Sequence, residues 1–298
     1  MNPDKLEDLR KAVVETGFPL ELDVDDVLTS LGFWTVPNRP YTDDETGKER
    51  EVDNYALFPD PNEDFLAIRP LGVSLHLTVE CKKLSNAGIV VFKAKKPAVT
   101  FHDFEGQMYD FPYLMEHRVR ASQLTTDFHL GWLLSKCKMH YTGFAPRIGI
   151  ARGVMPGRKK SGRKSEDAED QVFSGVMQLV KAQAHDVKES IARDKEISNP
   201  YYPLFFTFLA LVVDGDIVEV ESIGGLPKLI PVPHAIAKAY LKPSYSENYL
   251  GYLIDIVSKE HFPKYLSLIK ADAASLASAI GMDKKRAMDY LTRRSKVS

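Results

Sequence analysis

The sequence predicts an α/β fold with a central mixed β-sheet flanked by helices. Three observations predict this class. Helical periodicity near the N-terminus is followed by a pair of strand-like segments at 33–58 and by a third apolar strand at 73–81. A second helical segment covers 171–195, and a long apolar stretch begins at residue 203. Such alternation of helices and strands favours a mixed sheet with helices packed against it.

The composition is that of a globular chain without a strong electrostatic bias. Of 298 residues, 44% are hydrophobic and 27% are charged, and the formal net charge is −2. This balance excludes binding to nucleic acid through global charge, so any such contact needs local basic patches. The two cysteines, Cys81 and Cys137, are too few for a disulfide framework or a structural zinc site.

The apolar runs of the chain predict a cytoplasmic protein that does not enter a membrane. The N-terminal segment MNPDKLEDLRKAVVETG is charged and lacks the apolar stretch of a secretory signal. The longest apolar run, at 203–213, is shorter than the roughly 20 residues that a membrane helix needs. Cys81 belongs to a core-like strand, which suits a reducing compartment.

The N-terminal part predicts two helices, a hairpin and two further strands. Apolar residues recur at helical spacing over 3–16, the breaker GFP follows, and a second helix carries an apolar stripe that includes Leu28. Glu21 lies about two turns from Leu28 and therefore points the same way, and a favourable interaction with the helix N-terminus is the simple explanation. DDETGK supplies the hairpin turn, and a short apolar stretch at 87–94 follows the third strand.

The rest of the chain divides into an insertion, a second set of core elements and a helical end. The pattern weakens over about 97–168, which we interpret as an insertion. The helix at 171–195 is followed by an apolar strand, a DGD turn and a second strand, and YLGYLIDIVS predicts a further buried strand. The expected organisation is one domain over 1–270, with core segments at 17–94 and 171–222, and a helical C-terminal extension over 271–298.

The strand at 73–81 has one apolar face and one polar face, because side chains alternate along a strand. Glu80 and Lys82 lie side by side at the end of the polar face and project together. The preceding strand contributes Asp53 in REVDNYA. A buried, unpaired carboxylate is costly, and two neighbouring carboxylates repel each other unless a cation lies between them.

A divalent metal is the natural cation for such a pair of carboxylates. Mg²⁺ prefers hard oxygen ligands and takes few of them from the protein, so that it keeps waters for chemistry. A neighbouring lysine can then orient a water and stabilise charge that develops on a phosphate. The alternative is an ordinary salt bridge between Glu80 and Lys82, or cross-strand pairing with Arg50 or Lys48 on a solvated face. The acids in the preceding strand and in the second helix favour the metal site.

The segment GFPLELDVDDVLTSLGFWTVPNRPYTDDETGKEREVDNYAL, followed by LHLTVECKKL, resembles the PD-(D/E)XK nuclease superfamily, which has a restriction-endonuclease-like fold. The likeness covers about 17–94 and 171–222, and it rests on the order of elements as much as on the short motif. Val52 stands where the motif name has proline. The resemblance implies hydrolysis of phosphodiester bonds with Mg²⁺ or Mn²⁺ as the cofactor.

The resemblance also implies a role for each residue of the site. Asp53 and Glu80 would be the metal-binding acids, with the Cys81 carbonyl as a further ligand. Lys82 would be the catalytic lysine. Glu21 matches an acid that many members carry in the first core helix, where it tunes or completes the metal site.

Basic residues before and within the helix at 171–195 are the expected nucleic-acid contacts. The run GRKKSGRKS, followed by SEDAED, is either a loop that touches a nucleic-acid backbone or a solvated linker. Gln178 matches a glutamine that some nuclease families carry on the second core helix. The residues expected to contact DNA are Arg158, Lys159, Lys160, Arg163, Lys164, Gln178 and Lys181.

The sequence therefore predicts a metal-dependent nuclease that cleaves DNA, with Mg²⁺ held between Asp53 and Glu80 and with Lys82 assisting. One alternative is a catalytically silent nuclease-like module that binds DNA or protein. Another is a metal-dependent hydrolase of a small phosphorylated molecule, which fits the site but not the basic loop. A homodimer and protein partners in a larger complex both stay open.

Overall fold

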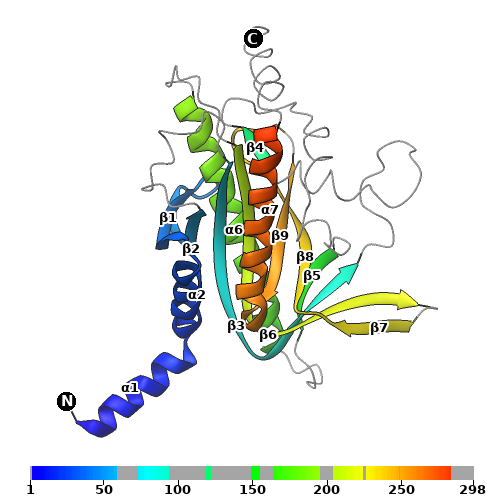
Figure 1. The fold of residues 1–298 in the computed structure, drawn as a ribbon. Helices are drawn as coiled ribbons and strands as arrows, with labels where there is room; N and C mark the ends of the chain where they lie inside the picture. The colour runs from blue at the N-terminus through cyan, green and yellow to red at the C-terminus, as the bar shows by residue number, and fades with distance from the viewer. Residues whose placement is uncertain are drawn as a thin grey trace.

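The computed structural model describes residues 2–58, 73–93, 119–121, 149–154, 164–194, 204–223, 226–247 and 249–282. Within these ranges the chain forms one mixed β-sheet that packs between helices (Figure 1). The helices are α1 (Pro3–Glu15), α2 (Phe18–Ser30), α6 (Lys164–Asp194) and α7 (Phe262–Met282), with the 3₁₀ helix η2 (Lys259–His261) before α7. The strands are β1 (Trp34–Asp43), β2 (Lys48–Phe58), β3 (Val73–Lys93), β4 (Val119–Ala121), β5 (Gly149–Val154), β6 (Leu204–Ile223), β7 (Leu226–Pro231), β8 (His234–Leu241) and β9 (Leu250–Ser258). The α/β class with a mixed sheet is therefore confirmed.

Strands β1 and β2 form the predicted antiparallel hairpin, from Trp34 opposite Leu57 to Asp43 opposite Lys48. The turn closes because the Gly47 N–H donates to the Asp43 carbonyl over 2.7 Å. Gly47 has a φ of 66°, a left-handed conformation that glycine adopts without steric cost. Beyond the hairpin, β2 pairs antiparallel with β3, so β2 holds β1 to the rest of the sheet.

Strands β3 and β6 are much longer than their sequences predict. β3 is one strand of 21 residues, where we expected a strand and a separate apolar stretch. The DGD sequence lies inside β6 and makes no turn there. The two strands run parallel, with a register shift between Lys83 and Gly88, and each supplies hydrogen-bond partners for the other's backbone. A Cβ at Gly88 would lie 3.0 Å from the Asp216 carbonyl oxygen, so glycine permits this close approach.

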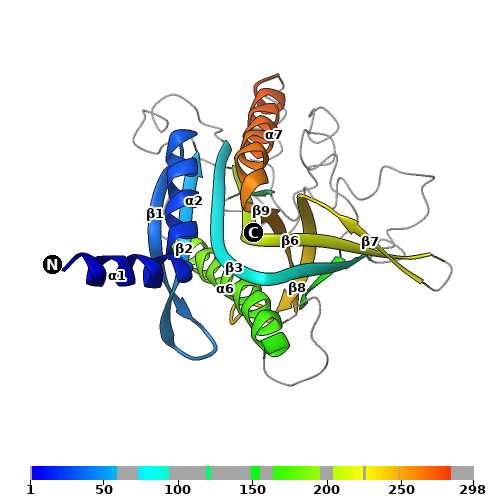
Figure 2. The ribbon, with the colours of Figure 1, turned by 90° about the horizontal axis from the view of Figure 1, so that it is seen from below.

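The sheet curls until it closes on itself. The far end of β3 pairs with β5, β5 pairs with β8, β8 pairs with β9, and β9 returns to β6, which already pairs with β3. Helix α6 packs inside this curl, and Figure 2 shows α6 and α7 on opposite sides of the bend in β3. The apolar core between α6 and the sheet includes Leu179, Val180, Leu211, Ile254 and Ile256, all buried.

Helices α2 and α7 cover the other face of the sheet. The predicted apolar stripe of α2 is confirmed, since Leu20, Val24 and Leu28 are buried there. Tyr265 of α7 is fully buried and donates its hydroxyl hydrogen to Asp255 of β9 over 2.9 Å. Each face of the sheet therefore has its own apolar core.

Two of the predicted boundaries, near residues 168 and 270, fall inside helices. Strands β4 and β5 come from the expected insertion and join the same sheet, while the rest of 97–163 lies outside the described residues. Helix α6 begins at Lys164, inside the predicted insertion. Helix α7 crosses the boundary expected after residue 270, and its Leu276 packs in the core.

Two parts of the structure extend away from the sheet. The end of β6 and the edge strand β7 form a hairpin that projects at the right of Figure 1, with Leu226 75% exposed and Leu229 63% exposed. Helix α1 projects from the other side of the molecule (Figure 1). None of the helices in the described ranges has the length and apolarity needed to cross a membrane.

Replacing Leu77 by alanine tests the core between the sheet and α7. Leu77 has no exposed surface. We expect Leu77→Ala to lower the free energy of unfolding by about 3 kcal/mol, because it removes buried methyl groups and leaves a cavity. Urea denaturation measures the loss. Leu226→Ala, at an exposed strand position, is the matched control and should change stability by less than about 0.5 kcal/mol. Equal losses would contradict this account of the core.

Candidate active site

Asp53, Glu80 and Lys82 come together where β2 meets β3. The Lys82 ammonium donates to Glu80 Oε2 over 2.9 Å. Asp53 Oδ2 accepts a hydrogen bond from the backbone N–H of Cys81 over 2.6 Å. The alternation of side chains along β3 and the position of Asp53 in the neighbouring strand thus place two carboxylates and one ammonium at the same site.

The salt bridge between Glu80 and Lys82, the first of the two alternatives, is present. Glu80 does not lie on a solvated face, as the cross-strand pairing would require. Glu80 has no exposed surface, and Thr78, two residues earlier on the same face, is 1% exposed. In the described part of the molecule, Glu80 Oε1 is buried without a hydrogen-bond partner. A buried carboxylate oxygen without a partner is costly and rare, so this atom calls for a ligand that is not part of the chain.

The electrostatics of the site follow from this burial. Burial raises the pKa of Glu80 to about 8, and the negative charge of Asp53 acts in the same direction. Burial also raises the pKa of Asp53, despite the opposing hydrogen bond from Cys81. Burial alone would lower the pKa of Lys82, but the neighbouring Glu80 carboxylate outweighs it and the pKa is raised. The site therefore keeps a charged lysine beside two carboxyl groups that resist ionisation.

Glu21 lies at the edge of this group, in the first turn of α2. Partial burial raises its pKa, and the charge of Asp53 adds to the effect while Lys82 opposes it. The described residues contain no set of three or more His, Cys, Asp or Glu side chains arranged to hold a metal. Among the described residues, Asp53 and Glu80 are therefore the pair of carboxylates that this place offers as side-chain ligands.

The donor set fits a hard divalent cation. Asp53 and Glu80 offer carboxylate oxygens, one of which is buried and unpaired. Burial raises the pKa of both groups, and a cation would stabilise their charged forms. Mg²⁺ commonly binds through one or two carboxylates and completes its shell with water. The Cys81 thiol is buried in the opposite core, and burial raises its pKa, so only the Cys81 main chain lies beside the site.

Helix α6 packs directly over Lys82. A Cβ at Gly175 would lie 2.9 Å from Lys82 Cε and 2.9 Å from Leu211 Cδ1, so the helix approaches this closely only because residue 175 is glycine. Gln178 lies one turn further along α6, partly buried, and its Oε1 accepts a hydrogen bond from Ser174 over 3.4 Å. A contact of Gln178 with a nucleic acid stays a prediction.

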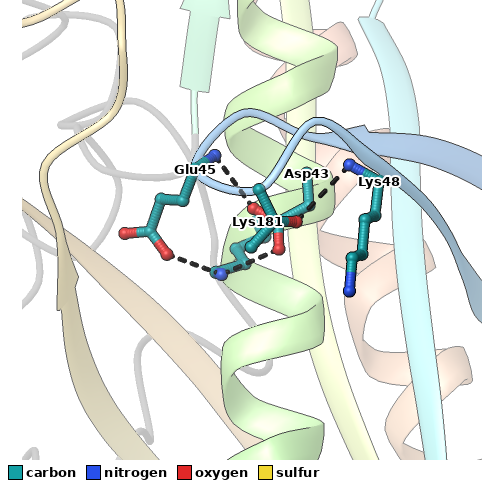
Figure 3. Close-up of polar contacts among 5 residues, drawn as sticks. Asp43, Glu45, Lys48 and Lys181 are labelled. Carbon is teal, nitrogen blue, oxygen red and sulfur yellow. Dashed lines mark hydrogen bonds and ion pairs between the residues drawn. The ribbon is translucent and has the colours of Figure 1, made fainter.

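Lys181 makes contacts within the chain. Its ammonium lies 3.0 Å from Asp43 and 2.7 Å from Glu45, both in the hairpin turn (Figure 3). About two turns further along α6, Lys188 pairs with Asp44 over 2.7 Å. These ion pairs fasten the β1–β2 turn to α6 and give Lys181 partners within the chain. A contact of Lys181 with DNA stays a prediction.

The remaining residues expected to bind DNA cannot be placed in the same way. Arg158, Lys159, Lys160 and Arg163 lie outside the described residues. Lys164 is the first residue of α6. The basic loop therefore stays a prediction.

A polar network beside the site was not predicted from the sequence. Arg39 makes two hydrogen bonds to Asp186 of α6, of 2.5 and 2.8 Å, and stacks 3.9 Å above the centre of the Tyr55 ring. The Tyr55 hydroxyl bonds to His76 Nδ1 over 2.7 Å. Burial, with Arg39 nearby, lowers the pKa of His76 to about 4, so this histidine is neutral near pH 7.

Tyr41 is a second feature that the sequence did not predict. It is 5% exposed and packs with Val52 and with Ala182 of α6. Burial and the charges of Glu80 and Asp43 raise its pKa to about 12. The sequence signal for such residues is weak, because an aromatic residue in a hairpin strand is ordinary and its neighbours on α6 are remote in sequence.

Comparison of the chain with protein-family models, with curated proteins and with solved structures gives no match. The function must therefore be inferred from the residues and geometry of the site.

The raised pKa of Glu80 predicts a specific dependence of stability on pH. The pKa is 4.5 in a solvated chain and about 8 in the folded protein, so folding favours the protonated acid. The stability that this group contributes is present below pH 4.5 and is lost as the pH rises through about 8. Without added metal, Glu80→Gln should therefore gain stability relative to wild type at about pH 8, and less at about pH 5.

Urea denaturation at the two pH values measures this difference. Glu247→Gln, at an exposed position, is the matched control and should follow the wild type at both pH values. A Glu80→Gln variant whose stability differs from wild type by the same amount at both pH values would show that Glu80 does not titrate in this way.

Proposed function

We propose that this protein is a metal-dependent nuclease of the PD-(D/E)XK type that hydrolyses phosphodiester bonds in DNA. The observation that carries the proposal is the buried Glu80 carboxylate, whose free oxygen lies in a site that also contains Asp53 and Lys82. The order of elements supports it, because α2, the β1–β2 hairpin, β3, α6 and β6 follow one another as the resemblance implies.

Each residue of the site has a distinct task in this proposal. Asp53 and Glu80 hold the cation, and α6 above the site limits the access of water to Glu80. A bound Mg²⁺ supplies a Lewis acid for the phosphate and lowers the pKa of a water nucleophile. Lys82 keeps its proton, because its pKa is raised, so its ammonium orients the water and offsets negative charge on the phosphate in the transition state. Glu21 adjusts the electrostatic potential at the edge of the site, next to Asp53 and Lys82.

One observation favours the alternative of a silent binding module. The salt bridge between Lys82 and Glu80 gives this carboxyl group a partner within the chain without any metal. A module that only binds DNA or protein could retain such a pair for stability. Metal binding and cleavage separate the two functions.

A cleavage assay tests the proposal. Plasmid and single-stranded DNA are incubated with the protein and Mg²⁺ or Mn²⁺. We expect cleavage that requires the metal and that falls roughly 100-fold or more in Asp53→Asn and in Lys82→Met, because each loses a group that acts on the transition state. Lys228→Met, on the exposed strand β7, is the control for loss of a lysine and should cleave at the wild-type rate. Cleavage that survives both site substitutions would refute the assignment of the site.

Metal binding is tested separately by calorimetric titration of the protein with Mn²⁺. Wild type should bind with release of a proton near pH 7, because the pKa of Glu80 is raised to about 8 in the metal-free protein. Asp53→Asn should lose this binding, while the exposed control Glu247→Gln should retain it. Folded wild type that neither binds the metal nor cleaves any DNA form would favour the binding module.

A further inference from the structure

The turn of the β1–β2 hairpin brings three consecutive acids against one face of helix α6. The Lys181 ammonium lies 3.0 Å from Asp43 Oδ2 and 2.7 Å from Glu45 Oε2 (Figure 3). The Lys188 ammonium lies 2.7 Å from Asp44 Oδ1. Lys181 and Lys188 are seven residues apart, or about two turns, so they share one side of the helix. The acids of the turn thus occupy these two lysines, which we call the basic face of α6.

The spacing of the two lysines suits the backbone of a nucleic acid. Seven residues of helix cover about 10.5 Å, and one strand of duplex DNA carries a phosphate for about every 3.4 Å of its axis. The basic face therefore spans about three phosphates. A lysine ammonium is a compact charge on a flexible chain, so it binds a phosphate without a fixed geometry. The acids of the turn place the same sign of charge where such phosphates would lie.

The contacts between the turn and the basic face join charged groups. Burial alone would raise the pKa of Asp44, but the hydrogen bond from Lys188 acts against burial and the pKa is lowered. Burial alone would lower the pKa of Lys181, but its hydrogen bonds to Glu45 and Asp43 raise the pKa. The carboxylate of Asp44 and the ammonium of Lys181 are therefore ionised near pH 7. Phosphates form the same kind of charge-assisted hydrogen bond, so a polyanion can compete with the turn for these lysines.

The chain holds these contacts with different firmness. Asp43 is buried, and its Oδ1 accepts a hydrogen bond from the Glu45 N–H over 3.0 Å, so its carboxylate belongs to the turn itself. In contrast, the side chain of Glu45 is 56% exposed and that of Lys188 is 46% exposed. Ion pairs with exposed partners stabilise a fold little, because water and salt screen them. Asp44 and Glu45 can therefore leave the lysines while Asp43 keeps the turn closed.

We propose that the basic face of α6 binds the phosphate backbone of a nucleic acid, and that the acidic turn covers this face until the backbone displaces Asp44 and Glu45. The turn acts as an internal competitor for the phosphates. It lowers the affinity of the free protein for nucleic acid, because each lysine must exchange a carboxylate for a phosphate when the polymer binds. The ion pairs of Lys181 and Lys188 and their contact with a nucleic acid are thus two states of the same residues.

The position of the basic face relates it to the candidate active site. Helix α6 packs on Lys82 at Gly175, six residues before Lys181, which is about 9 Å along the helix axis. A strand on the basic face therefore follows the same helix that covers Glu80 and Lys82. The inference rests on the proposed action on DNA, and it adds the surface along which the polymer lies and the segment that competes with it.

Fluorescence anisotropy with a short labelled DNA duplex, in the presence of EDTA so that no cleavage occurs, tests the inference on the full-length chain. Asp44→Asn/Glu45→Gln should bind the duplex roughly tenfold more tightly than wild type at low salt, because the two competing charges are gone. Glu7→Gln/Asp8→Asn, on the projecting helix α1, removes the same number of charges and should bind as wild type. Urea denaturation shows that each variant is folded. An equal affinity of wild type and the turn variant, or an equal gain in the α1 variant, would overturn the competition.

Substitution of the lysines in both backgrounds checks which residues the duplex contacts. Lys181→Met/Lys188→Met should weaken binding more in the turn variant than in wild type, because only in wild type does loss of the lysines also remove the bonds that the duplex must break. In the turn variant, the slope of log affinity against log salt should fall by about 2, about one for each lost phosphate contact. An unchanged slope would show that a phosphate does not take the place of the turn.

The outcomes separate this inference from the proposed function. A wild type that cleaves DNA, with a turn variant that binds no more tightly, would overturn the competition and leave the nuclease in place. A folded chain that neither binds nor cleaves any form of DNA would overturn both.

Discussion

The parallel pairing of β3 with β6 is the constraint on which the rest of the structure depends. Parallel neighbours cannot be joined by a tight turn, so the chain must leave the sheet and return between them. Helix α6 lies in that connection and packs against the sheet. Its position covers the face of β3 that carries Glu80, and this cover converts a polar strand face into a buried site. The curl of the sheet encloses α6 further and fixes its distance from the strands.

The candidate site buries polar and ionisable groups that globular proteins usually keep in solvent. A carboxylate oxygen without a partner, a second carboxyl group nearby and a lysine under a helix all oppose folding of the metal-free chain. Elsewhere along β3 the pattern is regular, with an apolar row facing α2 and α7. Proteins tend to break local rules at functional sites and keep them elsewhere. The contrast between the two faces of β3 is therefore informative about function even without a relative to compare.

The parts of the fold that the sequence predicts are those set by neighbours in the chain. The hairpin turn, the amphipathic stripe of α2 and the shared face of Glu80 and Lys82 follow from turn chemistry and from the periods of helix and strand. The parts that escape prediction depend on distant residues. Strand pairing overrides the DGD turn signal inside β6. From the sequence alone, Lys181 would be assigned to the solvated face of the helix. Its ion pair with Asp43 follows only from the packing of the hairpin turn against α6. The close approach of α6 to Lys82 likewise depends on Gly175, which lies 93 residues further along the chain.

The projecting hairpin of β6 and β7 carries its own protection. Strand β7 is an edge strand with two exposed leucines, the kind of surface on which a foreign strand can add. Pro227 and Pro231 lie two residues to either side of Leu229 and have no N–H to offer. A strand that approached this edge would find missing donors at alternate positions of the ladder. The prolines thus allow this exposed apolar hairpin to remain in solvent without serving as a template for fibre growth.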